Sequence, residues 1–172
     1  MRNHLLTTIA LSLLLYCFQA SANSGNDEQG FTIYLVRHAE KLTDKKDPAL
    51  TRCGLARSES IAKQLQLINI EMLYSTNYKR TQQTAAPIST SKRLSVISYD
   101  PANLPTFAKT LLATKKNAVV VGHSNTTAVL AGLLAEQSLT SFDESIYDRI
   151  YQVVRINGGV QLNILHQNFT CK

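Results

Sequence analysis

The chain has 172 residues, of which 44% are hydrophobic, and it has a formal net charge of +6 at pH 7. This length suits one domain with a buried core, and the composition excludes a chain that is disordered throughout. The basic residues are scattered along the sequence, whereas nucleic-acid-binding proteins more often gather them with aromatic residues in a stripe. We therefore expect an anionic small molecule, and no nucleic acid, as the partner.

The first 22 residues have the pattern of a secretory signal peptide. Arg2 is their only charge, an apolar stretch follows it, and the sequence ASA supplies a cleavage site that ends at Ala22. We predict cleavage after Ala22 and a periplasmic or secreted protein without a stable membrane anchor. The alternatives are an uncleaved anchor, although the apolar stretch is shorter than the ~20 residues of a spanning helix, and a lipoprotein attached at Cys17. A bulky Tyr16 stands where a lipoprotein signal has a small residue.

Residues 23–30 are small and polar and predict a flexible leader, and residues 31–172 predict a single domain. Short runs of β-branched and aromatic residues predict strands, and apolar residues at helical spacing predict helices. Thr51 has the position of an N-cap, and Pro87 is expected to weaken the last turn of its helix. In chain order we expect strand 31–36, helix 50–66, strand 70–76, helix 78–89, strand 94–100, helix 104–115, strand 117–123, helix 126–136, and a hairpin of strands 150–156 and 160–165.

This alternation predicts an α/β three-layer sandwich with a mainly parallel central sheet and a C-terminal β-hairpin. In such sheets, ligands bind beyond the carboxyl ends of the strands. Arg37 and His38 follow the first strand, Arg80 follows the second, and His123 closes the fourth. Each of these residues alone could be an ion-pair partner or a hydrogen-bonded core histidine. Their joint placement predicts that two arginines and two histidines meet at one edge of the sheet.

These residue types together favour phosphoryl transfer. The guanidinium fork of an arginine matches the oxygens of a phosphoryl group, and two forks can hold a phosphate dianion. A neutral histidine can attack phosphorus and form a covalent intermediate, while a second, protonated histidine can donate to the phosphoryl oxygens. The amides at the start of the helix after His123 would point at the same anion. Such a site needs no metal and no cofactor.

Three blocks of the sequence, LVRHAEK, YSTNYKRTQQTA and VVVGHSN, together resemble the histidine phosphatase superfamily, which has the phosphoglycerate-mutase-like fold. The resemblance runs from the first strand to the hairpin, and ALTRCG at 49–54 is similar to the start of the family's first helix. It implies that His38 is the nucleophile of a phosphatase acting on a small phosphorylated substrate. It also implies that Arg37, Arg80 and His123 form the phosphate pocket.

The chain departs from the family pattern at several positions. Ala39 replaces a glycine that many members have, and Ser124 stands where larger acid phosphatases have an aspartate. Mutase-type members supply a glutamate acid after the third strand, and the nearest carboxylate here is Asp100. We take Asp100 as the candidate proton donor, with Glu144 and Asp148 as rivals. Capping of the next segment is the alternative role of Asp100.

Several alternatives remain open from the sequence. Cys53 and Cys171, the two cysteines beyond the signal peptide, predict one disulfide in an exported chain, or else two unpaired thiols. A non-catalytic module that binds a phosphorylated ligand is the alternative to an enzyme. A metal hydrolase using His38, Glu40 and His123 is a weaker alternative, because their spacing matches no strong metal motif. The sequence indicates no particular oligomeric state.

Overall fold

The computed structural model describes residues 30–43 and 46–171. The expected signal peptide at 1–22 and all of the leader except Gly30 lie outside the described residues. The elements in chain order are β1 Phe31–Arg37, α1 Arg52–Gln64, β2 Met72–Ser75, α2 Lys79–Lys92, β3 Val96–Ser98, α3 Leu104–Thr114, β4 Ala118–Gly122, α4 Thr127–Ala135, β5 Arg149–Ile156 and β6 Gly159–His166. No helix within these ranges is long and apolar enough to cross a membrane.

The strands form one mixed sheet in the order β3-β2-β4-β1-β5-β6. The four strands β1 to β4 are parallel, and the hairpin of β5 and β6 adds antiparallel strands beside β1. This confirms the α/β sandwich with a mainly parallel sheet and a terminal hairpin. Because the four parallel strands point the same way, their carboxyl ends meet at one edge, and the segments that follow β1 and β4 become neighbours there.

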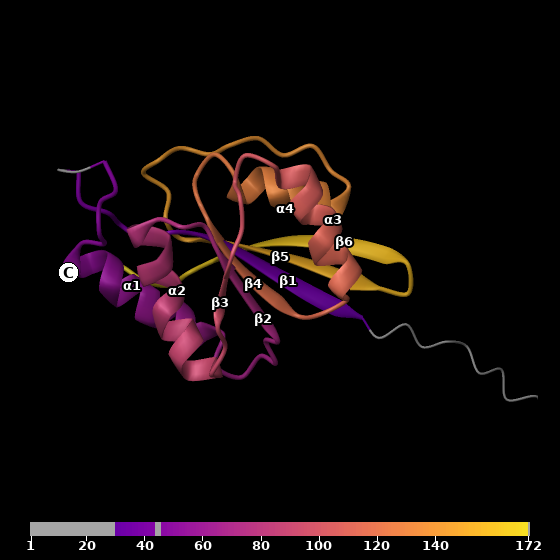
Figure 1. The fold of residues 1–172 in the computed structure, drawn as a ribbon, viewed down its shortest axis with the longest axis horizontal. Helices are drawn as coiled ribbons and strands as arrows, with labels where there is room; N and C mark the ends of the chain where they lie inside the picture. Colours follow the sequence, from indigo (N-terminus) through magenta and orange to yellow (C-terminus); the bar gives the residue numbers. More distant parts are fainter. Residues whose placement is uncertain (1–29, 44–45, 172) are drawn as a thin grey trace, which may run out of the picture.

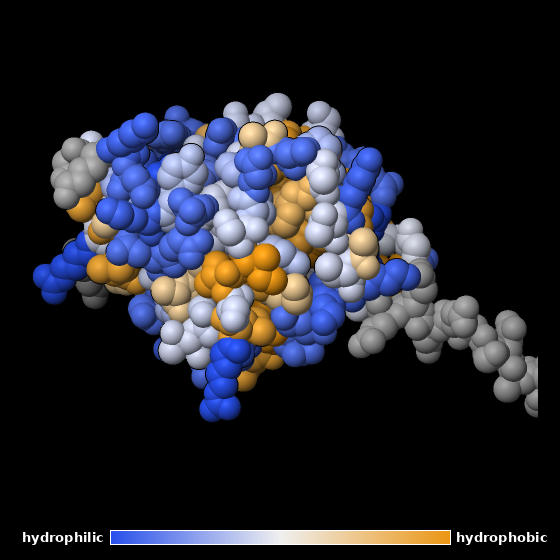
Figure 2. Space-filling model, in the orientation of Figure 1, coloured by the Kyte–Doolittle hydropathy of each residue, from blue (hydrophilic) through white to orange (hydrophobic). Residues whose placement is uncertain are grey.

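Helices cover both faces of the sheet, with α1 and α2 on one side and α3 and α4 on the other (Figure 1). Alternate residues of β1 serve the two cores: Ile33 and Leu35 face α3 and α4, whereas Tyr34 and Val36 face α1 and α2. All five residues of β4 are buried, as expected for a central strand covered on both faces. The face of the molecule shown in Figure 2 is largely hydrophilic, with a hydrophobic patch near its centre.

Of the two predictions about helix ends, the one for Thr51 is confirmed and the one for Pro87 is wrong. Thr51 is the N-cap of α1, and its side chain accepts a hydrogen bond from the Gly54 amide at 3.0 Å. The expected weakening at Pro87 is not seen, because α2 continues past it to Lys92. Two features compensate for the loss of the backbone hydrogen bond that proline cannot donate. Ile88 is fully buried, and the helix ends at Arg93 in a left-handed conformation with a φ of 56°, which donates to carbonyls of the last turn.

Candidate active site

The parallel register of β1 and β4 brings the two histidines together. Arg37 pairs with Gly122, and the amide of His38 donates to the carbonyl oxygen of Gly122 at 2.9 Å. His38 and His123 directly follow these paired residues, so their rings lie side by side, with centroids 5.5 Å apart and planes inclined by 67°. Both residues are buried, with 2% and 8% of their surface exposed. The meeting of these segments that the sequence predicts is therefore present.

Among the described residues, one ring nitrogen of His38 has a hydrogen-bond partner and the other has none. Its Nδ1 lies 2.8 Å from the carbonyl oxygen of Ala39, and a carbonyl can only accept, so Nδ1 carries the proton. Nε2 then has a free electron pair. Burial lowers the pKa of His38 to about 3, and the charges of Arg37, His123 and Arg80 contribute in the same direction. The ring is therefore neutral near neutral pH, which is the state a nucleophile requires.

His123 is also neutral, which differs from the protonated second histidine that the sequence analysis expects. Burial lowers its pKa to about 4, with further lowering by the charges of Arg80 and Arg37. Its Nε2 lies 2.9 Å from Oγ1 of Thr76, and its Nδ1 lies 3.4 Å from a guanidinium nitrogen of Arg80. An arginine can only donate, so Nδ1 accepts and Nε2 carries the proton in the free protein.

Arg80 stands in the first turn of α2 and lines the same hollow as the two histidines. One of its terminal nitrogens lies 3.6 Å from a carboxylate oxygen of Asp47, and its guanidinium carbon lies 4.6 Å from the ring centre of Tyr78. Its Nε is buried and has no hydrogen-bond partner among the described residues. An unpaired buried N–H of a guanidinium is costly, and an anion in the hollow would satisfy it.

Arg37 lies behind the hollow and does not line it. One terminal nitrogen donates to the carbonyl oxygens of Glu144 and Ile146, at 2.5 and 3.0 Å, and the other approaches the hydroxyl of Tyr147 at 3.4 Å. The Tyr147 ring lies 4.1 Å from the guanidinium carbon and 6.2 Å from the ring of His38, centre to centre. The Nε of Arg37 is buried and unpaired among the described residues. The terminal nitrogens of Arg37 thus hold residues 144–147, the segment before β5, while its Nε–H has no partner among the described residues.

The proton-donor candidate Asp100 does not line the hollow. Its carboxylate accepts from the amide of Ala102 at 2.9 Å, which is the capping role that the sequence analysis gave as its alternative. Its rival Asp148 pairs with His166 at 2.9 Å, also outside the hollow. Glu144, the other rival, does line it. The remaining wall includes Lys41, Pro101 and the turn 124–126 that leads into α4.

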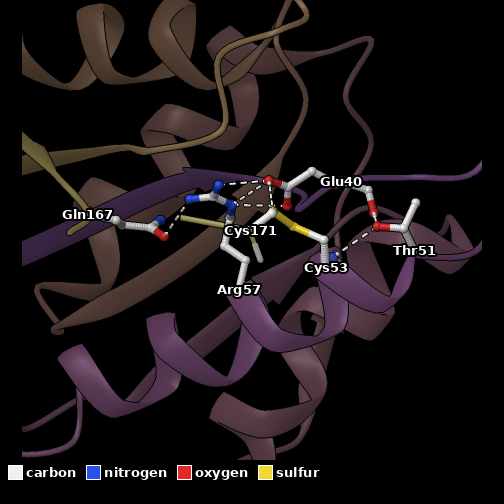
Figure 3. The surroundings of a disulfide bond; sticks show 7 residues. Glu40, Thr51, Cys53, Arg57, Gln167 and Cys171 are labelled. Carbon is white, nitrogen blue, oxygen red and sulfur yellow. Dashed lines mark hydrogen bonds and ion pairs between the residues drawn. A yellow bond between two sulfur atoms is a disulfide. The ribbon is translucent and has the colours of Figure 1, made fainter. Parts of the chain in front are cut away.

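An ion pair between Glu40 and Arg57 holds the segment that follows His38 (Figure 3). Both carboxylate oxygens of Glu40 accept from Arg57 on α1, at distances between 2.7 and 2.9 Å. A disulfide joins Cys53 to Cys171, with the two Cα atoms 5.5 Å apart, and so ties the C-terminal segment to α1 beside this pair. The ring of Phe169 lies 4.7 Å from the Arg57 guanidinium carbon. The C-terminal segment therefore covers the pair.

The residues of the metal-hydrolase alternative are not assembled, because Glu40 is engaged by Arg57 and does not line the hollow. Within residues 30–43 and 46–171, the group with ligand atoms close enough for a metal is Glu40, Cys53 and Cys171. Its two sulfur atoms are joined in the disulfide. A disulfide sulfur is not the thiolate that binds metals, so this donor set does not fit a resident metal ion.

Comparison with known proteins agrees with the geometry. Residues 33–101, which include Arg37, His38 and Arg80, match the model of the histidine phosphatase superfamily (branch 1). The match shows that the part of the chain from β1 to the end of β3 is similar to this superfamily. No curated protein sequence matches the chain.

Solved structures of phosphatases share the fold. The mycobacterial glucosyl-3-phosphoglycerate phosphatase superposes with a TM-score of 0.65 at 12% identity, over 83% of this chain and 100% of that one. The alpha-ribazole phosphatase from Shigella flexneri gives 0.65 at 13% identity, over 78% and 96%. A protein assigned as the phosphohistidine phosphatase SixA, from Agrobacterium tumefaciens, gives 0.58 at 20% identity, over 78% and 97%. These identities show a common fold.

Several residues around the hollow were not predicted from the sequence. Tyr78 and Tyr147 each lie against one arginine, and Asp47 pairs with Arg80. Tyr78 belongs to the YSTNYKRTQQTA block, so a tyrosine two residues before Arg80 was a signal that could have been used. Tyr147 and Asp47 lie in segments without regular structure, where no periodic pattern marks them.

Proposed function

We propose that the chain is a phosphatase that hydrolyses phosphomonoesters through a phosphohistidine on His38, without a metal ion. The observation that carries the proposal is the state of the His38 ring: neutral, held through Nδ1 by the Ala39 carbonyl, and free at Nε2 beside a second histidine and Arg80. Nε2 attacks phosphorus, the alcohol leaves, and water then hydrolyses the phosphohistidine.

The charges around the site support an anionic substrate. Arg80 presents a buried Nε–H that has no partner among the described residues, and Arg37 has another close behind His38. The positive charge of Arg37 is also the leading charge effect that lowers the pKa of His38. We assign to Arg80 and His123, which line the hollow, the task of holding the phosphoryl group. Arg37, which the sequence placed in the same pocket, instead holds the 144–147 segment and helps to keep His38 neutral. A bound dianion would raise the pKa of His123 and favour its protonated form.

We further propose that the protein is exported. The proposal rests on the signal-peptide pattern of residues 1–22 and on the disulfide between Cys53 and Cys171, a bond that is typical of oxidising compartments. Expression of the full chain in a bacterium tests it. Cell fractionation should recover the protein in the periplasm or medium, with an N-terminus at Asn23. An intact N-terminus in the cytosol would contradict export.

The test of the activity is a panel of phosphomonoesters, incubated with the mature protein in excess chelator. We expect release of inorganic phosphate from at least one of them, and the His38→Ala variant is the blank. Activity that disappears under chelation would contradict the metal-independent mechanism. Full activity in the variant would contradict the role of His38.

The position of Asp100 outside the hollow favours a second candidate, a module that binds phosphorylated ligands without turning them over. Inorganic phosphate or a phosphomonoester would then bind to the wild-type protein, as measured by calorimetry, while no product appears between pH 4 and 8. Product release in the panel above rejects this candidate.

A further inference from the structure

An acidic residue, Glu144, is exposed at the wall of the hollow. Glu144 lines the hollow together with His38, Arg80 and His123. From this placement we infer that Glu144 is the proton donor to the leaving oxygen and, in the second step, the base for the attacking water. The inference rests on the proposed phosphatase activity and extends it to esters of poorly acidic alcohols, whose oxygen cannot leave without a proton.

The backbone around Glu144 is held by the site itself. Arg37 donates to the carbonyl oxygens of Glu144 and Ile146, which fixes the peptide on both sides of Ser145. The amide of Phe142 donates to the carbonyl oxygen of Ser124, in the turn after His123, at 3.3 Å. The segment between α4 and β5 thus passes over the edge of the sheet at which β1 and β4 end (Figure 1). These contacts use the Glu144 backbone and leave its side chain available.

Glu144 is also distinguished from the other carboxylates around the hollow. Within residues 30–43 and 46–171, no hydrogen bond or ion pair engages its side chain. The other carboxylates of the surrounding segments each have a partner: Glu40 has Arg57, Asp47 has Arg80, Asp100 has the Ala102 amide, Asp143 has Ser145, and Asp148 has His166. A carboxylate that must exchange a proton with substrate and water needs this freedom.

The proton balance of the cycle closes with Glu144 alone. In the first step, a bond forms between Nε2 of His38 and phosphorus, the P–O bond to the alcohol breaks, and the proton of the Glu144 carboxyl moves to the leaving oxygen. In the second step, the ionised Glu144 takes a proton from water as that water attacks the phosphohistidine. The products are inorganic phosphate, neutral His38 and a protonated Glu144, so no further reactant is needed.

The test compares two substrates that differ in their leaving group. p-Nitrophenyl phosphate releases a stable phenolate and needs little help from an acid, whereas glycerol phosphate releases an alkoxide and needs a proton. We expect Glu144→Gln to lower kcat/KM for glycerol phosphate about 100- to 10,000-fold, while kcat/KM for p-nitrophenyl phosphate stays nearly unchanged. Glu144→Asp, which keeps an acid, should recover part of the loss. Asp100→Asn, the matched variant of the other candidate, should affect neither substrate.

Each other outcome overturns the inference. An equal loss with both substrates would show that Glu144 acts on binding or on local structure, and no loss with either would show that it has no role. A loss confined to glycerol phosphate in Asp100→Asn would assign the donor to Asp100. A wild-type protein that releases p-nitrophenol through His38 but does not hydrolyse glycerol phosphate would overturn the inference and leave the proposed function standing. Absence of hydrolysis of both by the wild type would overturn both.

Discussion

The ring of His38 is bound to the carbonyl oxygen of its own neighbour Ala39, at 2.8 Å from Nδ1. That carbonyl belongs to a segment held on both sides: the Ala39 amide donates to Thr84 at 3.0 Å, and the Glu40 carbonyl accepts from the Thr51 amide at 2.9 Å. The backbone therefore decides which nitrogen of the nucleophile faces the hollow, and α1 and α2 fix that backbone.

The fixed tautomer predicts the site of phosphorylation. The covalent intermediate should carry phosphate on Nε2 of His38 and not on Nδ1, because Nδ1 donates to a carbonyl that cannot move away freely. Trapping the intermediate by rapid quench at high pH, followed by NMR of the phosphopeptide, distinguishes the two isomers. An Nδ1 adduct would contradict the role given to Ala39.

The lowered pKa values of the histidines predict activity in mildly acidic solution. With the pKa of His38 at about 3 and that of His123 at about 4, both rings stay neutral as the pH falls from 7 to 5. A histidine with an ordinary pKa would be about 30-fold less available as a nucleophile at pH 5. We expect no such loss in kcat/KM for p-nitrophenyl phosphate, after correction for the ionisation of the ester. NMR titration midpoints near 6.5 for either ring would contradict this.

The ion pair between Asp47 and Arg80 predicts that Asp47 weakens anion binding. Its carboxylate, 3.6 Å from Arg80, competes with a phosphoryl group for the same guanidinium. Asp47→Asn keeps the shape and should tighten the binding of inorganic phosphate about two- to fivefold at low salt, an effect that salt reduces. Glu136→Gln, at an exposed carboxylate that pairs with Arg155 outside the hollow, serves as the charge-matched control. Equal tightening in both variants would point to net charge instead of the pair.

The packing of α1 against the segment after His38 predicts a strong effect at Gly54. A Cβ on this residue would lie 2.1 Å from the carbonyl oxygen of Glu40, so Gly54→Ala must displace the backbone. We expect a loss of about 3 kcal/mol in the free energy of unfolding, measured in urea, together with lower activity. Gly158→Ala is the matched control. It has a φ of 75° with open space around it, and should lose only about 1–2 kcal/mol without a change in kcat.

The disulfide predicts a large contribution to stability. Cys53 and Cys171 are 118 residues apart, and cross-linking so long a segment restricts the unfolded chain by about 4–5 kcal/mol in the chain-entropy account. The Cys53→Ser/Cys171→Ser double variant should lose about this much in urea unfolding. The wild-type protein in reducing buffer should lose the same amount, and reducing agent should not affect the double variant. Unchanged unfolding of the reduced wild type would contradict the contribution.

The sequence predicted the fold well where the signals are local or repeated. Alternating apolar strands and amphipathic helices gave the parallel sheet and hairpin, and Thr51 marked the start of α1. The prediction for α2 was too short, since the effect of Pro87 on its own helix is outweighed by burial of Ile88 and by the helix end at Arg93. Propensity describes one residue at a time, whereas packing sums over the whole helix.

By itself, the sequence determined which segments meet: the residues after β1, β2 and β4 come to one edge of the sheet because parallel strands must end there. Only the tertiary structure decided how side chains use that edge. It put Arg37 behind the hollow against the 144–147 segment, paired the Asp100 carboxylate with the amide of Ala102, and left Glu144 as the acidic residue that lines the hollow. The succession of strands and helices along the chain follows from periodicity, but the course of a loop over a site depends on contacts distant in sequence, which no local pattern encodes.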